Sequence, residues 1–311
     1  MEGSQNYNRR KFIGDVAKAT ACIGLAGVPL DVLAKSNTVK VTILHTNDTH
    51  SRIDPFPAND PKFAGMGGVA RRMSLINKIR GEEKNVLLLD SGDIFQGTPY
   101  FNFYGGELEM KLMTLMGYDA ATMGNHDFDN GIQGFVKQLP HASFPFLCSN
   151  YDFKNTELEG RTLPYKIFIK DGVNIGVFGI GIELAGLVDE KNFGKTVYSN
   201  PIDVANKTAA YLKKEKKCDL IICLSHLGFK YENSKKNSDE MLATQTENID
   251  LILGGHTHTF IDTPEKYHNL KNKEVLVAQT GWAGIRLGRI DFYVEKKSSL
   301  ISSRGTTVKI S

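Results

Sequence analysis

The chain has 311 residues, of which 41% are hydrophobic, 23% charged and 9% aromatic. This is the composition of an ordinary globular protein, and it excludes wholesale disorder, collagen-like repeats and a small disulfide-stabilised scaffold. The 38 Lys and Arg residues against 35 Asp and Glu residues leave a formal net charge of +3, too small to predict a nucleic-acid-binding or membrane-surface protein.

The first 34 residues have the features of an export signal. Arg9 and Arg10 precede a weakly apolar stretch that ends near Ala34, a small residue at a plausible cleavage site. Paired arginines at this place are typical of the twin-arginine type, which predicts a periplasmic or otherwise exported protein. Asp15 and Lys18 interrupt the stretch, so an amphipathic N-terminal helix is the alternative. No stretch reaches about 18 uninterrupted apolar residues, so we expect no stable membrane span.

Five short apolar runs, separated by helical patterns, predict the buried strands of an α/β fold. In chain order they are residues 39–44, 85–89, 118–123, 219–224 and 249–253. Each run is followed by side chains that can bind metal ions or transfer protons: Asp48, His50, Asp93, Asn125, His126, Asp127, His226, His256 and His258. Because ligands bind at the carboxyl ends of strands in open α/β sheets, we expect these side chains to form one site.

The spacing within these segments supports a shared site. Residues two apart in an extended chain point to the same side, so Asp48 with His50, and His256 with His258, can each direct two side chains to one place. A single histidine at a strand end is more often a structural residue than a ligand. Five of the eight histidines fall in these short segments, however, and that concentration predicts a metal site.

The residue types narrow the choice of metal. Carboxylate, amide and imidazole ligands suit Mn, Fe, Zn or Co, whereas Ca prefers oxygen alone. Two such ions roughly 3.5–4 Å apart can activate a bridging hydroxide for in-line attack on a phosphoester. Too many donors are present for one ion, so we expect two divalent ions that share one carboxylate and draw on Asp48, His50, Asp93, Asn125, His226, His256 and His258.

The ordered motifs resemble those of the calcineurin-like metallophosphoesterase superfamily, and specifically the catalytic, N-terminal domain of the bacterial 5′-nucleotidase/UDP-sugar hydrolase family. The resemblance covers roughly residues 39–295. The superfamily motifs are Asp48-Thr-His50, Gly92-Asp93, Gly124-Asn-His-Asp127, Ser225-His226 and Gly254-Gly-His-Thr-His258. Closer marks of the nucleotidase branch are His45–His50, Cys148-Ser-Asn150 and Gln279-Thr-Gly281 followed by Leu287-Gly288.

The resemblance implies a four-layer α/β/β/α sandwich of two mostly mixed β-sheets, formed by residues 35–311 as a single domain. It implies that Asp93 bridges two metal ions. Asp48, His50 and His258 would complete one set of ligands, and Asn125, His226 and His256 the other. It also implies that His126 gives a proton to the leaving oxygen or stabilises the phosphoryl group while Asp127 orients it. The expected substrate is a nucleotide or a related small phosphomonoester.

Two departures from the family pattern leave alternatives open. Several nucleotidases of this branch carry an amide at the position of His258. The chain also ends without the family's C-terminal nucleotide-binding domain, so we expect that domain to be absent and a separately encoded partner to be one way of supplying it. A 2′,3′-cyclic nucleotide phosphodiesterase and a thiosulfate-type ester hydrolase are the rival enzymes. A non-catalytic scaffold subunit is the rival from another class.

Three further features of the sequence support weaker predictions. The polar loop from Lys230 to Asn237 follows His226 and is a candidate substrate-contacting loop. Trp282 could stack on a substrate base, although a lone tryptophan more often packs in the core. Cys218 and Cys223 lie five strand steps apart, roughly 16 Å, which is too far for a disulfide.

Overall fold

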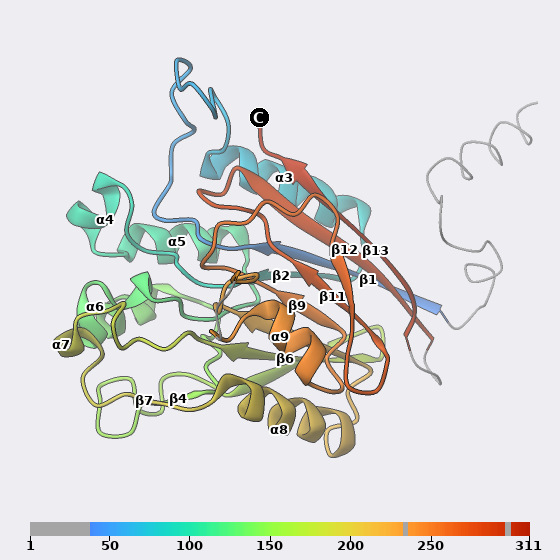
Figure 1. The fold of residues 1–311 in the computed structure, drawn as a ribbon. Coiled ribbons are helices and arrows are strands. Elements are labelled where there is room, and N and C mark those ends of the chain that lie inside the picture. The colour runs from blue at the N-terminus through green and yellow to red at the C-terminus, as the bar shows by residue number, and fades with distance from the viewer. Residues whose placement is uncertain (1–37, 233–235, 296–299) are drawn as a thin grey trace, which may run out of the picture. The chain divides into compact units, whose positions relative to one another are not determined.

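The computed structural model describes residues 38–232, 236–295 and 300–311 (Figure 1). The expected export signal over residues 1–34 lies outside these residues and stays a prediction. Among the described helices, none is long and apolar enough to cross a membrane.

The first β-sheet has five strands in the order β13-β12-β1-β2-β3. β1, β2 and β3 run parallel, whereas β12 and β13 form an antiparallel pair. The strands are β1 (Thr38–Thr46), β2 (Val86–Asp90), β3 (Ala120–Ala121), β12 (Arg286–Glu295) and β13 (Leu300–Lys309).

The second β-sheet has six strands in the order β10-β11-β9-β8-β6-β5. Its four inner strands are parallel, and both outer strands are antiparallel to their neighbours. The strands are β5 (Tyr165–Lys170), β6 (Val173–Ile180), β8 (Leu220–Ser225), β9 (Leu251–Leu253), β10 (Glu265–His268) and β11 (Glu274–Ala278). A separate small pair joins β4 (Tyr151–Asp152) to β7 (Val197–Tyr198).

Alternating side chains divide the core into layers. In β8, Leu220, Ile222 and Leu224 pack in a cluster shared with the first sheet. The intervening Ile221 and Cys223 pack instead against the outer helices. This period of two is the pattern of a strand whose two faces are both buried. The two sheets therefore pack against each other through one shared apolar layer.

Helices cover the outer face of each sheet. The first sheet packs on α3 (Val69–Glu82), α5 (Glu107–Met116) and α6 (Gly131–Gln138). The second sheet packs on α8 (Pro201–Lys214) and α9 (Asp239–Gln245). Shorter elements are α4 (Pro99–Tyr104), η1 (His126–Phe128), η2 (Leu139–His141) and α7 (Glu190–Phe193). The predicted four-layer α/β/β/α arrangement of mixed sheets is thus confirmed.

The five predicted strands are all present, as β1, β2, β3, β8 and β9. β3 is shorter than the apolar run 118–123 because its last residues turn into the loop that packs on Gly92. A Cβ on Gly92 would lie 2.5 Å from the backbone nitrogen of Gly124, and the φ of Gly92 is 87°. Only glycine fits both conditions, so the loops after β2 and β3 can lie in close contact.

Helix caps fix the outer layer over the second sheet. Asn200 precedes α8, and its side-chain oxygen accepts hydrogen bonds from the backbone N–H groups of Ile202 and Asp203. Pro201 occupies the first helical turn, where its missing N–H is not needed.

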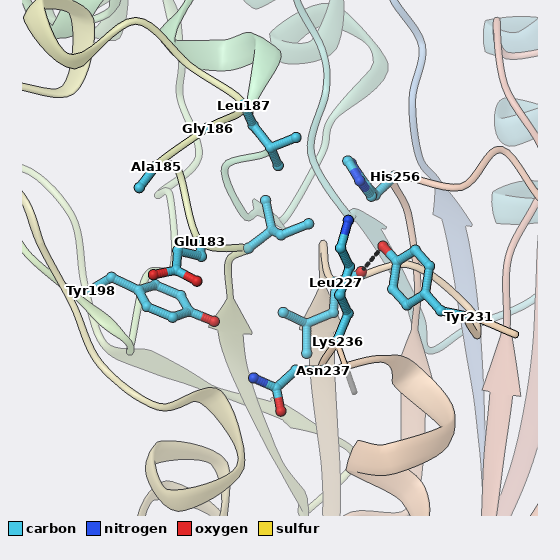
Figure 2. A pocket seen from close by; sticks show the side chains of 11 residues that line it. Glu183, Ala185, Gly186, Leu187, Tyr198, Leu227, Tyr231, Lys236, Asn237 and His256 are labelled. Atoms are coloured by element: carbon cyan, nitrogen blue, oxygen red, sulfur yellow. Dashed lines mark hydrogen bonds between the residues drawn. The ribbon is translucent and has the colours of Figure 1, made fainter. Parts of the chain in front are cut away.

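A cavity of about 660 Å³ lies between the loops that follow β6 and β8 (Figure 2).

The described cysteines form no disulfide. Cys148, Cys218 and Cys223 are all buried and free. The expectation that Cys218 and Cys223 are not joined is confirmed.

Candidate metal centre

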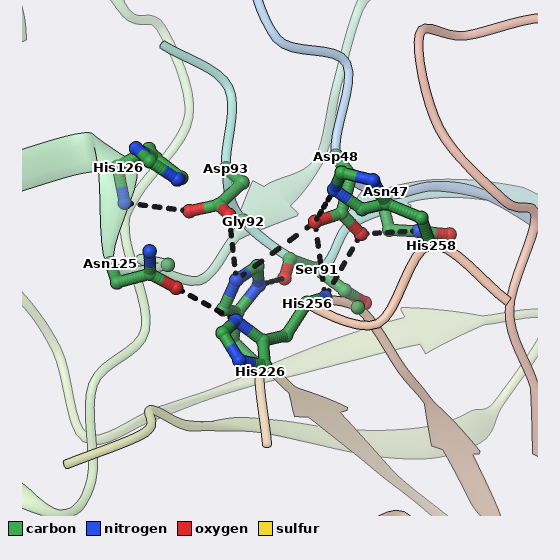
Figure 3. A network of polar contacts seen from close by, with 12 residues as sticks. Asn47, Asp48, Ser91, Gly92, Asp93, Asn125, His126, His226, His256 and His258 are labelled. Carbon is green, nitrogen blue, oxygen red and sulfur yellow. Dashed lines mark hydrogen bonds and ion pairs between the residues drawn. The ribbon is translucent and has the colours of Figure 1, made fainter. Parts of the chain in front are cut away.

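The carboxyl ends of strands from both sheets meet at one polar cluster (Figure 3). The loops after β1, β2 and β3 come from the first sheet, and the loops after β8 and β9 come from the second. The structure brings all seven predicted donors together here, in two adjoining groups, and places His126 beside them.

The first donor group consists of Asp48, His50 and His258. The Nε2 atoms of the two histidines are 3.0 Å apart. His258 Nε2 lies 3.4 Å from Asp48 Oδ1, and His50 Nε2 lies 3.9 Å from the same oxygen. One ligand atom from each of the three residues lies within 4.8 Å of the other two.

The second donor group consists of Asp93, His226 and His256, with Asn125 beside them. His226 Nε2 lies 3.0 Å from Asp93 Oδ2, and His256 Nδ1 lies 2.8 Å from Asn125 Oδ1. The same Asp93 oxygen is 3.8 Å from His50 Nε2 of the first group. Asp93 therefore lies between the two groups.

The distances between donor atoms fit two bound metal ions. Two ligand atoms about 2.1 Å from one ion, at angles of about 90–110°, are roughly 3.0–3.4 Å apart. The His226–Asp93, His50–His258 and His258–Asp48 distances all fall in this range. His226 Nε2 is fully buried and lies 3.0 Å from a carboxylate oxygen of Asp93. A cation or a proton must separate these atoms.

Hydrogen bonds from the backbone fix which ring nitrogen faces the centre. His226 Nδ1 is 2.7 Å from the carbonyl oxygen of Ser91, and His50 Nδ1 is 3.1 Å from that of Phe95. A carbonyl oxygen only accepts, so Nδ1 carries the hydrogen in each ring. The lone pair of Nε2 in the neutral imidazole is then directed at the donor cluster, as in a metal-binding histidine.

Electrostatics also favour positive charge at the centre. Burial opposes ionisation of Asp93, yet His226 and His50 hold the pKa of its carboxyl well below the usual range. Burial would lower the pKa of His226, but Asp93 and Asp48 raise it instead. Burial and the nearby His226 lower the pKa of His256 to about 4. The buried Asp93 carboxylate is thus stabilised by positive charge on the neighbouring histidines.

Five of the seven donors have a left-handed backbone. The φ angle lies between 47° and 70° at these residues, a region that residues with a side chain rarely adopt. Such strain persists only where the surrounding structure fixes it, and it concentrates at functional sites. The residues are Asp48, His50, Asp93, His256 and His258.

Asn47 connects the loop after β1 to the loop after β11, and sequence reasoning did not assign it to the site. Its Oδ1 accepts hydrogen bonds from the backbone N–H and the hydroxyl of Thr280, at 2.8 and 2.7 Å. Its Nδ2 donates to the Gly281 carbonyl at 2.7 Å and to Asp48 Oδ2 at 2.5 Å. The motifs 45–50 and 279–281, noted above as marks of one branch, thus meet across the two sheets.

The contact expected between Asp127 and His126 is replaced by another. Asp127 is fully buried, and its carboxylate accepts backbone N–H bonds from Asp93, Ile94 and Gly124 at 2.8–3.0 Å. His126 Nδ1 bonds instead to Asp129 Oδ2 at 2.9 Å. The one-turn helix η1 explains the change, because residues three apart share a helix face and adjacent residues do not. The i, i+3 spacing was the available signal for Asp129.

Trp282 packs on the first donor group. Its ring stacks on the ring of His258, with centroids 5.7 Å apart and an interplanar angle of 7°. Phe56 and Phe63 contact its other sides. This packing limits the rotation of a histidine whose side chain is otherwise 39% exposed.

Comparison with known proteins gives a consistent result. A model of the calcineurin-like phosphoesterase family matches residues 41–260, which include every donor from Asp48 to His258. The chain is 32% identical over 301 residues to snake venom 5′-nucleotidase of Crotalus adamanteus, covering 88% of this chain and 48% of the relative. It is 32% identical over 290 residues to the trifunctional nucleotide phosphoesterase protein YfkN of Bacillus subtilis (strain 168), covering 83% of this chain and 18% of the relative.

Solved structures agree with the sequence matches. The 5′-nucleotidase precursor from Thermus thermophilus superposes with a TM-score of 0.78 at 29% identity, covering 88% of this chain and 55% of that one. The calcineurin-like phosphoesterase YfkN from Bacillus subtilis gives a TM-score of 0.69 at 26% identity, covering 88% and 91%. The chain spans about half the length of the snake venom relative, with 48% of it covered.

Proposed function

We propose a function for this chain from its family: the chain belongs to the calcineurin-like phosphoesterase family and corresponds to the N-terminal catalytic domain of its 5′-nucleotidase members. From this premise we propose that it is a metal-dependent hydrolase that releases phosphate from nucleotides or related phosphomonoesters. The observation that carries the proposal is the pair of adjoining donor groups with Asp93 between them. The two nucleotide-directed relatives named above support nucleotides as the substrate class.

Two divalent ions would be held by the two donor groups. Asp48, His50 and His258 form one ligand set, Asn125, His226 and His256 form the other, and Asp93 belongs to both. When bound, such ions supply Lewis-acid charge and an activated water for attack on phosphorus. The mixed nitrogen and oxygen donors suit Mn, Fe, Zn or Co.

The remaining residues position groups and move protons. His126 lies beside the donors, with its ring centroid 5.3 Å from that of His50 and 37% of its side chain exposed. Asp129 holds Nδ1 and raises the pKa of His126, so the ring keeps a proton that Nε2 can give to the leaving oxygen. Asp127 acts one step away, by holding the backbone of the loop that carries Asp93.

A substrate panel tests the proposal. Protein loaded with Mn, Co or Zn should release phosphate from AMP and from p-nitrophenyl phosphate, and Asp93→Asn should abolish release from both. Asp203→Asn, at an exposed position in α8, removes a carboxylate away from the cluster and is the matched control. A metal-loaded protein that hydrolyses no phosphoester would rule the proposal out. 2′,3′-Cyclic AMP and a thiosulfate-type ester belong in the same panel, because either could prove the better substrate.

We also propose that the protein is exported, on the basis of Arg9-Arg10 and the weakly apolar stretch that follows. Cell fractionation of the full chain tests this. The double substitution Arg9→Lys and Arg10→Lys should retain the protein inside the cell. Unchanged export of that variant would contradict the twin-arginine type.

A further inference from the structure

The cavity between the loops after β6 and β8 adjoins the second donor group. His256 lines one end of it, and Tyr198 of β7 lines the opposite end (Figure 2). β6 and β8 are parallel neighbours, so the loops that follow them leave the sheet at the edge where His226 lies. A substrate with its phosphorus at the donors therefore has this cavity of about 660 Å³ as adjoining space for the rest of the molecule.

One end of the cavity carries a positive charge. Lys236 extends along the cavity with its Nζ pointing toward His256 (Figure 2). The ammonium group lies 5.7 Å from the centroid of the Tyr231 ring, and the Tyr231 hydroxyl donates to the Leu227 carbonyl oxygen at 2.6 Å. This hydrogen bond fixes the position of the Tyr231 ring, which in turn supports the Lys236 side chain. An anionic group of a ligand is favoured at this end.

The other end offers hydroxyl, amide and carboxylate groups. In Figure 2 the Tyr198 hydroxyl points toward Asn237, and the Glu183 carboxylate lies beside the Tyr198 ring. Burial and the Glu183 charge together raise the pKa of Tyr198 to about 12, so its hydroxyl remains a hydrogen-bond donor at neutral pH. A carboxylate accepts two hydroxyl groups well, and an amide both donates and accepts. A neutral group with hydroxyls is favoured here.

The size and surface of the cavity also suit a nucleoside. Ligand cavities of about 300–1,000 Å³ hold small molecules of this size. Tyrosine rings provide flat faces on which a base can stack. Carboxylates commonly bind the vicinal hydroxyls of ribose in nucleotide sites.

We propose that this cavity binds the nucleoside part of a nucleotide substrate, with Glu183 accepting hydrogen bonds from the ribose hydroxyls and Lys236 facing the phosphate end. This inference rests on the proposed function, which it deepens by assigning a leaving-group site to this domain itself. It also gives a role to the described part of the loop from Lys230 to Asn237, since Tyr231, Lys236 and Asn237 line the cavity.

Deoxynucleotides test the assignment of Glu183. The kcat/KM of AMP should exceed that of 2′-deoxy-AMP or 3′-deoxy-AMP by roughly tenfold, the effect of one hydrogen bond to a charged group. In Glu183→Gln the KM for AMP should rise more than kcat falls, and the preference for the ribonucleotide should largely disappear. Glu190→Gln, at an exposed position in α7, is the matched control and should leave the preference as it is.

Lys236 is tested by comparing ligands with and without phosphate. Lys236→Met should raise the KM for AMP severalfold, whereas the inhibition constant of adenosine against p-nitrophenyl phosphate should change little. Glu183→Gln should weaken adenosine inhibition. Equal losses on every substrate in both variants, or a wild-type protein that does not distinguish AMP from its deoxy analogues, would overturn the assignment.

A direct binding measurement separates this inference from the proposed function. Isothermal titration of adenosine into the metal-loaded protein measures binding to the cavity without requiring hydrolysis. If no phosphoester is hydrolysed but adenosine binds and Glu183→Gln weakens it, the proposed function fails and the nucleoside site stands. If phosphoesters are hydrolysed but adenosine neither binds nor inhibits, the nucleoside site fails and the proposed function stands.

Discussion

The two donor groups use the same residue types but are supported differently. His226 of the second group is fully buried, and the Ser91 carbonyl oxygen, 2.7 Å from its Nδ1, fixes its tautomer. His258 of the first group keeps 39% of its side chain exposed and is held by stacking on Trp282. Each group thus has one buried histidine held by a backbone carbonyl, His50 or His226, and the groups differ because His258 of the first is exposed and depends on an aromatic contact from a later loop. We call the first group the exposed group and the second the buried group. We expect the exposed group to bind its metal more weakly and to exchange it faster.

The largest expected effect comes from breaking the buried group. His226→Asn leaves the Asp93 carboxylate buried without its imidazole partner, which costs on the order of 3–5 kcal/mol of stability in the metal-free protein. His258→Asn removes a partly exposed contact and should cost about 1 kcal/mol or less. Urea unfolding of both variants, followed by metal titration of each, measures the difference. Equal losses in the two variants would mean that burial does not distinguish the groups.

Substitution of His126 tests whether the two donor groups are sufficient for hydrolysis without a separate proton donor. His126→Ala should lower the kcat for AMP by roughly 100-fold or more, because the leaving alkoxide needs a proton. The loss should be much smaller for p-nitrophenyl phosphate, whose leaving group is a weak base. Metal stoichiometry of the variant serves as its control. A uniform loss on both substrates would show that His126 supports the donors and does not protonate the leaving group.

His45 can be compared with the donor histidines, because it is a buried histidine that belongs to neither donor group. Neither of its ring nitrogens has a hydrogen-bond partner among the described residues, and burial lowers its pKa to about 3. Its ring covers Gly288, where a Cβ would lie 1.9 Å from Nε2. The folded state keeps His45 neutral, whereas the unfolded chain binds a proton below about pH 6.5. The contribution of neutral His45 to the free energy of unfolding is therefore fully present at pH 7.5, and it is lost as the pH falls toward 3.

The size of that pH effect follows from linkage. Between about pH 7.5 and 5.0 the wild type should lose about 2 kcal/mol of unfolding free energy through this one group. His45→Leu should lack that part of the pH dependence. Denaturant midpoints at the two pH values, compared between the two proteins, give the difference. The same slope in both proteins would show that the imidazole is protonated in the folded state.

The smallest expected effect concerns Trp282. It is the single tryptophan of the chain, so its fluorescence should report a metal ion bound by His258, with quenching by Co²⁺. Trp282→Ala removes a stacked pair worth about 0.5–1.5 kcal/mol and should weaken metal binding by up to about tenfold in the exposed group. Trp282→Phe keeps a ring in place and should lose less. Fluorescence that does not change on metal binding would place the metal elsewhere.

Part of this site could be predicted from sequence. The short apolar runs end in metal-binding residue types, so the strands and a cluster of such side chains at their ends could be predicted from pattern, and β1, β2, β8 and β9 lie where the runs predicted. The link between His126 and Asp129 was missed because it depends on a single helical turn after Asn125.

Other features depend on contacts between distant segments. Asn47 bonds to Thr280, which is 233 residues away, and Trp282 stacks on a histidine from a different loop. The left-handed backbone at five donors is also invisible in sequence, since only glycine signals such a conformation by its identity. Contacts between residues far apart in the sequence leave no local sequence pattern. The residue types of the donors could therefore be predicted from sequence, whereas the contacts that hold those donors in place could not.

The central claim is that two unequal donor groups each bind one metal ion and that hydrolysis needs both. Equilibrium titration of the metal-free protein with Mn²⁺, with phosphate release from AMP measured at every point, tests it most directly. We expect two equivalents to bind in sequence, the buried group first, and activity to rise with the second equivalent. Saturation at one equivalent, or full activity after the first, would contradict the account.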